Sequence, residues 1–457
     1  MGRITRRALL KDSGLLGVAI ASSGVLAACA PTPSAAPVAP EAVAATEVAA
    51  PAPSDEKFDL LGQIAVNPDY QPYIDEVLIP AWKEKYPNGN IEITPLPSGS
   101  LQEVLLTSKA ANALPDIFTM WAQMSPIAAE NQLSLPLNER LAEWEEAEDF
   151  FDFCTYYCEW QGEMWGLPNV LAPRDYCYRR DLTEEAGVTI PDDWTFDDYL
   201  AAVPELTIVE DGKLVRMGST ADNYALEYYL VLYSAKGALL KGGKAAFNSE
   251  AGLWALNFIK ERNWAAAPTG AAPLAESPIN YFATGQVVIA WYVSSYYWRE
   301  LVKYAPEKEE YWVLPLPPLK ERRVVTAYIN QVALAPNSKY PEAAWDFLKL
   351  HLSLDSLVAY AESRGQLPPR KSAVDQSDYM RLRGTAATFK GIATYGAPQG
   401  KWPIHSQMGD TIATMLESVS LGVKSPEQAL ADAEAEVNKA MEPYPDWPDT
   451  GLDIEGT

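Results

Sequence analysis

Apolar residues alternate between strand-like and helix-like spacing over residues 58–121, the start of the predicted folded region. Strands show apolar residues at every second position, and helices show them at every third or fourth position. The pattern predicts three strands and two helices in the order 58–66 (strand), 74–82 (helix), 91–94 (strand), 101–113 (helix) and 115–121 (strand). This order indicates a parallel sheet covered by helices, an α/β architecture. Ligands of such sheets lie beyond the carboxyl ends of the strands, so we expect one rim to carry Asn67, Asp69, Ser98, Ser100, Trp121 and Gln123.

The stretch Trp160–Leu182 separates this region from the rest of the chain. It contains a Gly-Glu-Met-Trp-Gly turn, the extended pair Leu167-Pro168, a short mixed segment up to Arg174, and a strand at Tyr176–Tyr178. Proline restricts its own backbone and that of the preceding residue. We therefore expect the chain to cross here from one lobe to another.

The second half continues the mixed α/β pattern. Thr195 is a suitable N-cap for a helix that has Asp197 and Asp198 in its first turn. The remaining expectations are a loop at 217–220, a helix at 225–233, a buried strand at 287–291 followed by a turn rich in Ser and Tyr, an edge segment at 312–318, a strand at 324–335, a helix at 341–352 and a helix that starts at Ser425.

Composition narrows the range of functions. The chain has 457 residues, which favours two lobes, and a formal charge of −25, which disfavours nucleic acid and anionic membrane surfaces as partners. With two histidines, His351 and His405, there is little basis for imidazole metal sites or histidine-assisted nucleophiles. We expect no metal and no cofactor. The 14 Trp and 24 Tyr exceed what a core needs and supply rings for a binding cleft.

The N-terminus has the features of an export signal. Thr5–Lys11 resembles a twin-arginine motif, the apolar run 14–28 is too short to span a membrane, and Leu26-Ala27-Ala28-Cys29 resembles a lipobox. We expect a signal peptide at 1–28, a lipid on Cys29 and a flexible linker at 29–57 that is rich in Ala and Pro. The general secretory route stays open as an alternative to twin-arginine export. Both place the protein outside the cytoplasm, anchored to the outer face of the cell membrane.

Three further cysteines, Cys154, Cys158 and Cys177, leave their pairing open. An exported protein can form a disulfide, but an odd number leaves at least one thiol free or paired between molecules.

Short segments along the chain resemble family 1 extracellular solute-binding proteins, the carbohydrate-binding components of ABC importers related to maltose-binding protein. They occur in family order and cover about residues 58–442: 79–87 with 91–93, 113–118, 162–168, 178–182 with 186–187, 282–288, 335–339, 343–348, 364–370 and the Ser425 helix. The resemblance implies a two-lobe periplasmic-binding-protein-like fold of type II, with a mixed sheet flanked by helices in each lobe. It also implies a hinge of about three crossings, near 167–174, 315–326 and 367–372.

The lobe boundaries that follow are 58–168 with 326–368 for the N-terminal lobe and 169–325 with 369–445 for the C-terminal lobe, with a tail at 446–457. The resemblance implies a monomer that captures a sugar or oligosaccharide by lobe closure and delivers it to an ABC permease, without chemistry.

A sugar site needs flat aromatic rings and directional polar groups on a concave surface. The expected ligand-binding residues combine these two types: Asn67, Asp69, Trp121, Arg174, Trp291, Tyr292, Tyr296, Tyr328, Asn330 and Trp402. For Trp121 a place in the core is as good an interpretation, and Arg174 could instead brace the hinge. Trp82 and Trp345 lie on apolar helix faces and are expected in the core.

Two other functions stay open. The first is capture of a non-sugar solute such as a polyamine or a phosphate ester. The second is a secreted glycoside hydrolase, which would need two carboxylates at a fixed separation across a sugar.

Overall fold

The computed structural model describes residues 56–65, 67–96, 101–268 and 278–448. The expected signal peptide, Cys29, most of the linker, Ser98, Ser100 and the end of the expected tail lie outside these residues. Among the described helices, none has both the length and the apolar character needed to cross a bilayer.

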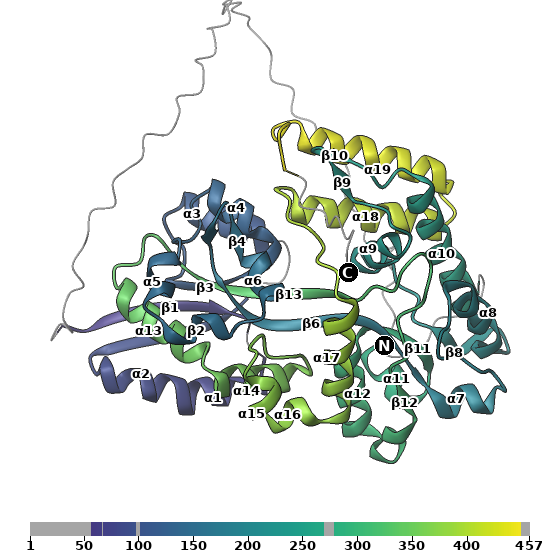
Figure 1. Ribbon diagram of the computed structural model, residues 1–457, viewed down its shortest axis with the longest axis horizontal. Helices are drawn as coiled ribbons and strands as arrows, with labels where there is room; N and C mark the ends of the chain where they lie inside the picture. Colours follow the sequence, from purple (N-terminus) through teal and green to yellow (C-terminus); the bar gives the residue numbers. More distant parts are fainter. Residues whose placement is uncertain (1–55, 66, 97–100, 269–277, 449–457) are drawn as a thin grey trace, which may run out of the picture. The chain divides into compact units, whose positions relative to one another are not determined.

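A nine-stranded mixed sheet forms the centre of the fold (Figure 1). Its strands follow the order β2 (Gly89–Pro95), β1 (Phe58–Ile64), β3 (Ile117–Trp121), β13 (Thr326–Leu334), β6 (Leu167–Arg179), β11 (Val287–Val293), β8 (Lys213–Ser219) and β7 (Ile208–Glu210), and β12 (Trp312–Val313) pairs with β6. Strands β2, β1 and β3 are parallel, as the strand–helix alternation predicts. Two small hairpins lie outside this sheet: β4 (Glu159–Trp160) with β5 (Glu163–Met164), and β9 (Leu240–Lys241) with β10 (Lys244–Ala245).

Helices cover both faces of the β2–β1–β3 part of the sheet. Alternation along β1 buries Phe58, Leu60 and Ile64 against one layer of helices, in a cluster that includes the expected core residues Trp82 and Trp345. That layer contains α1 (Gln71–Tyr73), the π-helical turn η1 (Ile74–Leu78), α2 (Ile79–Lys85), α13 (Pro341–His351) and α14 (Leu354–Arg364). The opposite layer contains α3 (Leu101–Ala110) and α4 (Ser125–Glu130).

Shorter elements link this part to β6: η2 (Ala122–Met124), α5 (Asn138–Ala142), η3 (Glu145–Asp149) and α6 (Asp152–Cys158). The helices that follow β6 are α7 (Arg180–Glu185), α8 (Phe196–Leu206), α9 (Ala225–Ser234), α10 (Glu250–Ala266), α11 (Pro278–Thr284), α12 (Ser294–Tyr304) and η4 (Pro306–Tyr311). After α14 come α15 (Ala373–Gln376), α16 (Asp378–Arg381), α17 (Arg383–Tyr395), α18 (His405–Ser420) and α19 (Pro426–Met441). Thr195 caps α8 in a capping box with Asp198, as predicted.

Strand β6 corrects the expectation of a mixed segment before Tyr176. It is one 13-residue strand that pairs with β13 over Leu167–Arg174 and with β11 over Arg174–Tyr178. Pro168 has the extended geometry expected of it and lies within β6, where the β6–β13 register shifts between Asn330 and Gln331, opposite Pro168. A bulge is one of the places where a strand accepts proline.

Two other local expectations are wrong. The predicted loop at 217–220 is the end of β8, where Gly218 lies so close to α8 that a Cβ would collide with the main-chain oxygen of Val203. The predicted Ser- and Tyr-rich turn after β11 is the helix α12, because Tyr297, Trp298 and Leu301 recur at helical spacing and are buried together.

The predicted tail begins as packed structure. The ring of Trp447 stacks on Trp160 at 4.8 Å between centroids, and its indole nitrogen donates to the main-chain oxygen of Lys401 at 3.0 Å. Residues 446–448 therefore belong to the folded body, and the rest of the predicted tail lies outside the described residues.

Candidate functional site

Two hollows of about 450 Å³ each lie beside the central strands. The first is lined by Asn67, Asp69, Asp222, Trp291, Tyr292, Val293, Tyr296, Tyr297, Arg299, Ser363, Arg364 and Gln366. The second is lined by Trp121, Gln123, Tyr224, Ala225, Leu226, Tyr229, Tyr328, His405, Ser406, Gly409, Asp410 and Ala413. Each lining combines residues from before β6 with residues from after it, so each hollow is bordered by both halves of the chain.

The structure groups most of the predicted ligand-binding residues around these hollows. Five of them line the first hollow: Asn67, Asp69, Trp291, Tyr292 and Tyr296. Trp121 and Tyr328 line the second. Arg174, Asn330 and Trp402 are outside both linings.

Arg174 lies between the two hollows, within a group of aromatic rings. Its guanidinium carbon is 3.9 Å from the ring centroid of Tyr292, which lines the first hollow. It is 5.9 Å from the rings of Tyr224 and Tyr328, which line the second. The side chain is 4 % exposed, and its Nε and Nη1 atoms have no hydrogen-bond partner among the described residues. The nearby cation lowers the pKa of the Tyr292 phenol below its usual value.

Strand alternation on β11 gives neighbouring aromatic residues different environments. Trp291 is 1 % exposed, whereas Tyr292 is 38 % exposed. The Trp291 ring packs against Tyr224 at 5.8 Å between centroids, and its buried indole nitrogen has no partner among the described residues. Trp291 is thus a core residue that also borders the first hollow, while Tyr292 offers its ring to the open space.

The second hollow presents one indole and one imidazole. The rings of Trp121 and His405 meet edge to face, with 5.8 Å between centroids. Burial lowers the pKa of His405 to about 4, so its imidazole is neutral at pH 7. Its Nδ1 atom, Ser406 Oγ and Gln123 Oε1 have no partner among the described residues and are available for hydroxyl groups.

Asn67 and Trp402 support the site's walls. The Asn67 amide donates to the main-chain oxygen of Ser363, and its side-chain oxygen accepts from the Tyr70 amide, so the polar atoms of Asn67 already have partners. Trp402 is 2 % exposed and stacks on His405 with 6.3 Å between centroids, which places it behind the second hollow. Asn330 is buried on β13 next to Trp121 in the β3–β13 register, and its side-chain oxygen lacks a partner among the described residues.

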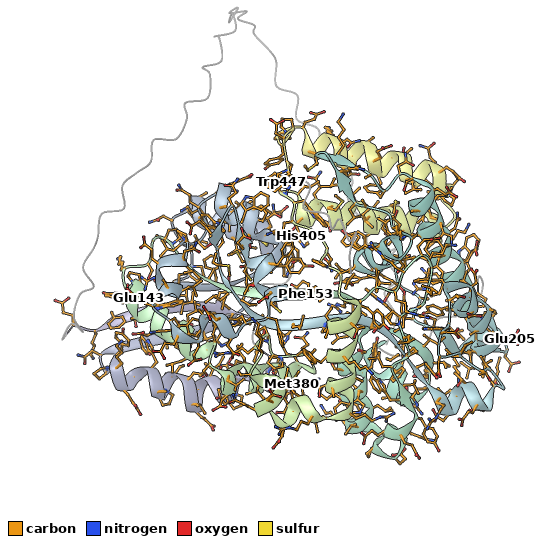
Figure 2. The ribbon with its side chains drawn as sticks, viewed as in Figure 1. Glu143, Phe153, Glu205, Met380, His405 and Trp447 are labelled. Atoms are coloured by element: carbon orange, nitrogen blue, oxygen red, sulfur yellow. The ribbon has the colours of Figure 1, made fainter. Side chains whose placement is uncertain are left out.

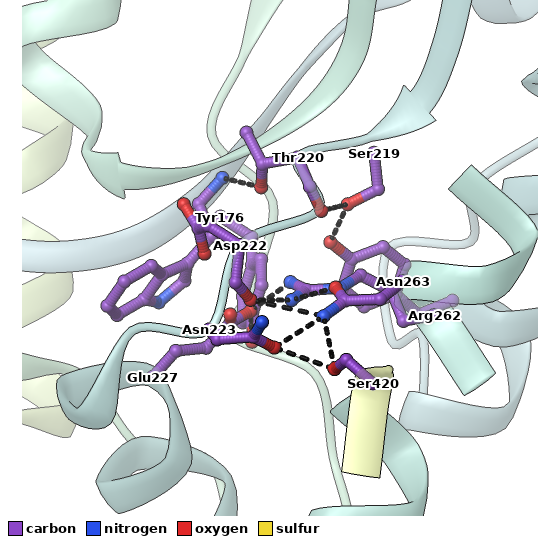
Figure 3. Close-up of polar contacts among 11 residues, drawn as sticks. Tyr176, Ser219, Thr220, Asp222, Asn223, Glu227, Arg262, Asn263 and Ser420 are labelled. Atoms are coloured by element: carbon purple, nitrogen blue, oxygen red, sulfur yellow. Dashed lines mark hydrogen bonds and ion pairs between the residues drawn. The ribbon is translucent and has the colours of Figure 1, made fainter. Parts of the chain in front are cut away.

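The segment Thr220–Tyr224, which follows β8, was missed in the sequence and contributes to both hollows through Asp222 and Tyr224. A buried polar network holds it in place (Figure 3). Arg262 Nη2 and Asn263 Nδ2 both donate to the main-chain oxygen of Asp222, at 3.2 and 3.3 Å. Asn263 also donates to the side-chain oxygen of Asn223.

The network ends in a fully buried ion pair between Arg262 and Glu227, both 0 % exposed. Tyr176 on β6 donates its phenol hydrogen to Glu227 at 3.0 Å. The sequence signal for this pair is weak: Glu227 in α9 and Arg262 in α10 each occupy a position that the helix pattern otherwise fills with apolar residues. The pair therefore connects the central strand, α9 and α10 to the segment that carries Asp222.

Asp175 introduces a pH dependence. It is 2 % exposed on β6, and burial raises its pKa to about 8, although its carboxylate accepts a hydrogen bond from the Tyr176 amide. The raised pKa means that the folded state favours the protonated form. The associated stability is complete below the unfolded pKa of about 4 and is lost as the pH rises through about 8.

We predict that the free energy of unfolding of the wild type falls between pH 7 and pH 9 more steeply than that of Asp175→Asn. The amide keeps an acceptor for Tyr176 and cannot ionise. Urea unfolding at several pH values measures the difference, and parallel curves for the two proteins would contradict the assignment.

The three cysteines within the described ranges are buried thiols. Cys154, Cys158 and Cys177 are free and buried, and burial raises the pKa of each thiol. Within the described ranges, no group of three or more His, Cys, Asp or Glu residues could hold a metal ion.

A comparison with known protein families identifies the family to which this chain belongs. The family of bacterial extracellular solute-binding proteins matches residues 67–354, more than half of the chain. The chain belongs to this family. Its members are binding proteins, and the family is extracellular.

Individual relatives of this solute-binding protein are distant. It is 25 % identical over 286 residues to an arabinooligosaccharide-binding protein of Bacillus subtilis, an alignment that covers 59 % of this chain and 64 % of the relative. A solute-binding protein of a Thermotoga lettingae ABC transporter, bound with α-D-tagatose, has a TM-score of 0.71 at 22 % identity and covers 84 % of this chain and 99 % of its own. A Listeria monocytogenes ABC substrate-binding protein in complex with cycloalternan has a TM-score of 0.72 at 18 % identity, with 84 % and 99 % covered. These structures confirm the two-lobe α/β fold that the sequence predicts.

Proposed function

We propose that this protein captures a sugar or oligosaccharide outside the cell and delivers it to an ABC import permease by closure of two lobes. The observation that carries the proposal is the arrangement around Arg174. A buried guanidinium with unpartnered donors lies between two hollows whose walls combine aromatic rings with polar atoms. Rings pack on the apolar faces of sugars and polar atoms bond their hydroxyls. Because residues from both halves of the chain border each hollow, a bound solute stabilises the closed arrangement.

The relatives support this choice of solute. The Bacillus subtilis relative is named for arabinooligosaccharide binding, and the structures of similar fold were solved with tagatose and cycloalternan. The non-sugar alternative is weaker: a polyamine would meet three arginines at or beside the first hollow, Arg174, Arg299 and Arg364.

The test is a fluorescence titration of the mature protein with mono- and oligosaccharides and with polyamines. We expect saturable binding of at least one saccharide without turnover. Binding of polyamines alone, or hydrolysis of a glycan, would contradict the proposal.

Replacement of the ring at the edge of the second hollow should weaken binding. For Trp121→Ala we expect a loss of about 1–3 kcal/mol in saccharide affinity, because a stacked aromatic ring contributes on that scale. The control is Trp264→Ala on α10, which removes a half-exposed indole that is outside both linings. Equal affinities for the two variants would assign Trp121 to the core.

The proposal extends to export and anchoring. Cleavage before Cys29 and attachment of a lipid to its sulfur would hold a monomer on the outer face of the membrane, with residues 30–57 as a tether. Cys29→Ser should release the protein from membranes into the soluble fraction. Retention in the membrane fraction would contradict the lipid anchor.

The hinge at the three crossings and the lobe boundaries given above are part of the same proposal.

A further inference from the structure

Three buried hydrogen-bond donors at or beside the first hollow have no partner among the described residues. Arg174 supplies Nε and Nη1, and Trp291 supplies its indole nitrogen. All three atoms are buried, and no described residue accepts from them. Unpaired buried donors are costly to maintain, so this group suits a solute with acceptor oxygens.

The charges at the same place point to an acidic solute. Arg299 already pairs with Glu300 at 2.9 Å and donates to main-chain oxygens of α14. Arg174 and Arg364, in contrast, have no ion-pair partner within 4.0 Å among the described residues. Arg364 donates only to the neutral amide of Gln366 in the described contacts, at 3.0 Å. Three tyrosine rings compensate the Arg174 cation in part.

The second hollow differs in character. Its unpartnered atoms include the amide oxygen of Gln123, which accepts hydrogen bonds, and the hydroxyl of Ser406, which can accept or donate. With the Trp121 and Tyr229 rings in the same lining, it suits a neutral sugar ring. The two hollows are therefore chemically unequal, with Arg174 at their junction.

We propose that the solute is an acidic saccharide, in which a carboxylate, as in a uronic acid, binds Arg174 and Arg364 while a neutral part occupies the second hollow. This rests on the proposed function. A planar guanidinium matches a carboxylate with two parallel hydrogen bonds. A singly charged carboxylate also fits better than a doubly charged phosphate, because Asp69 and Asp222 line the same hollow.

The experiment is calorimetry with a panel of uronic-acid disaccharides, each beside its neutral parent sugar, together with sugar phosphates. Wild type should bind at least one uronate at least 10-fold more tightly than its neutral parent. Arg174→Met should weaken uronate binding about 10- to 100-fold more than it weakens binding of the neutral parent, because it removes a charged hydrogen bond to the carboxylate that the parent lacks. Arg364→Gln provides a second variant if Arg174→Met does not fold.

The charge-matched control is Arg381→Gln, an exposed arginine on α16 whose loss should leave both affinities unchanged. Neutral parents that bind as tightly as their uronates would overturn the acidic-solute inference and leave the proposed function intact. Tightest binding of sugar phosphates would overturn the choice of a carboxylate. Absence of binding by every saccharide would overturn the proposed function and this inference with it.

Discussion

Arg262→Met is expected to lower the free energy of unfolding by about 3–5 kcal/mol, since it leaves the Glu227 carboxylate buried without its cation. The substitution also removes the donors to the main-chain oxygen of Asp222 and to the side chain of Asn263. The Thr220–Tyr224 segment should loosen, so solute affinity should fall together with stability. Urea unfolding and solute titration on the same samples measure the two effects.

The double variant Arg262→Met/Glu227→Leu is the matched control. Replacing both members of a buried ion pair by apolar residues is often neutral or stabilising, so the second substitution should recover at least half of the lost stability. A single variant as stable as wild type, or a double variant less stable than the single one, would contradict the role assigned to this pair.

Trp291→Ala is expected to cause the second large loss of stability. The sequence predicts Trp291 as a ligand-binding residue, and this variant distinguishes a packing role from a binding role. The side chain is 1 % exposed within the core cluster that contains Tyr176 and Tyr229. Truncation of a buried tryptophan leaves a cavity and costs about 3–5 kcal/mol. Thermal and urea unfolding of the variant measure that loss.

Trp291→Phe tests the same position with a ring retained. It should lose less stability than Trp291→Ala, because it leaves a smaller cavity and the lost indole nitrogen has no partner in the described structure. An alanine variant that keeps wild-type stability and loses only solute affinity would show that Trp291 acts as a ligand contact and not as core.

The fold was predictable where one pattern dominated. The alternation in β1 and the apolar faces of α2 and α13 can all be buried in one way, by packing against each other, and Trp82 and Trp345 lie in that core. Predictions failed where two signals competed. Residues 169–174 mix polar and apolar types and suggested an irregular segment, but their pairing with β13 makes them part of β6. Ser294 and Ser295 suggested a turn, but the buried face of α12 decided the outcome.

The site was predictable in its residue types more than in its geometry. Strand ends placed Asn67, Asp69 and Trp121 near the hollows, because strand direction is a local property. Asp222, Tyr224 and His405 could not be found in this way. Their positions depend on contacts between distant segments, such as the one between Asn263 and Asp222, 41 residues apart. Whether Trp291 or Tyr292 is exposed also depends on which face of β11 each residue occupies. Composition does not show this.

Hydrogen–deuterium exchange with and without a saturating saccharide tests most directly the claim that the solute is held between the two halves of the chain. We expect simultaneous protection of the segment around Trp121 and Gln123, before β6, and of Thr220–Ser234 and the start of α12, after it. Protection confined to one half of the chain, or none at all with a saccharide bound, would contradict the account.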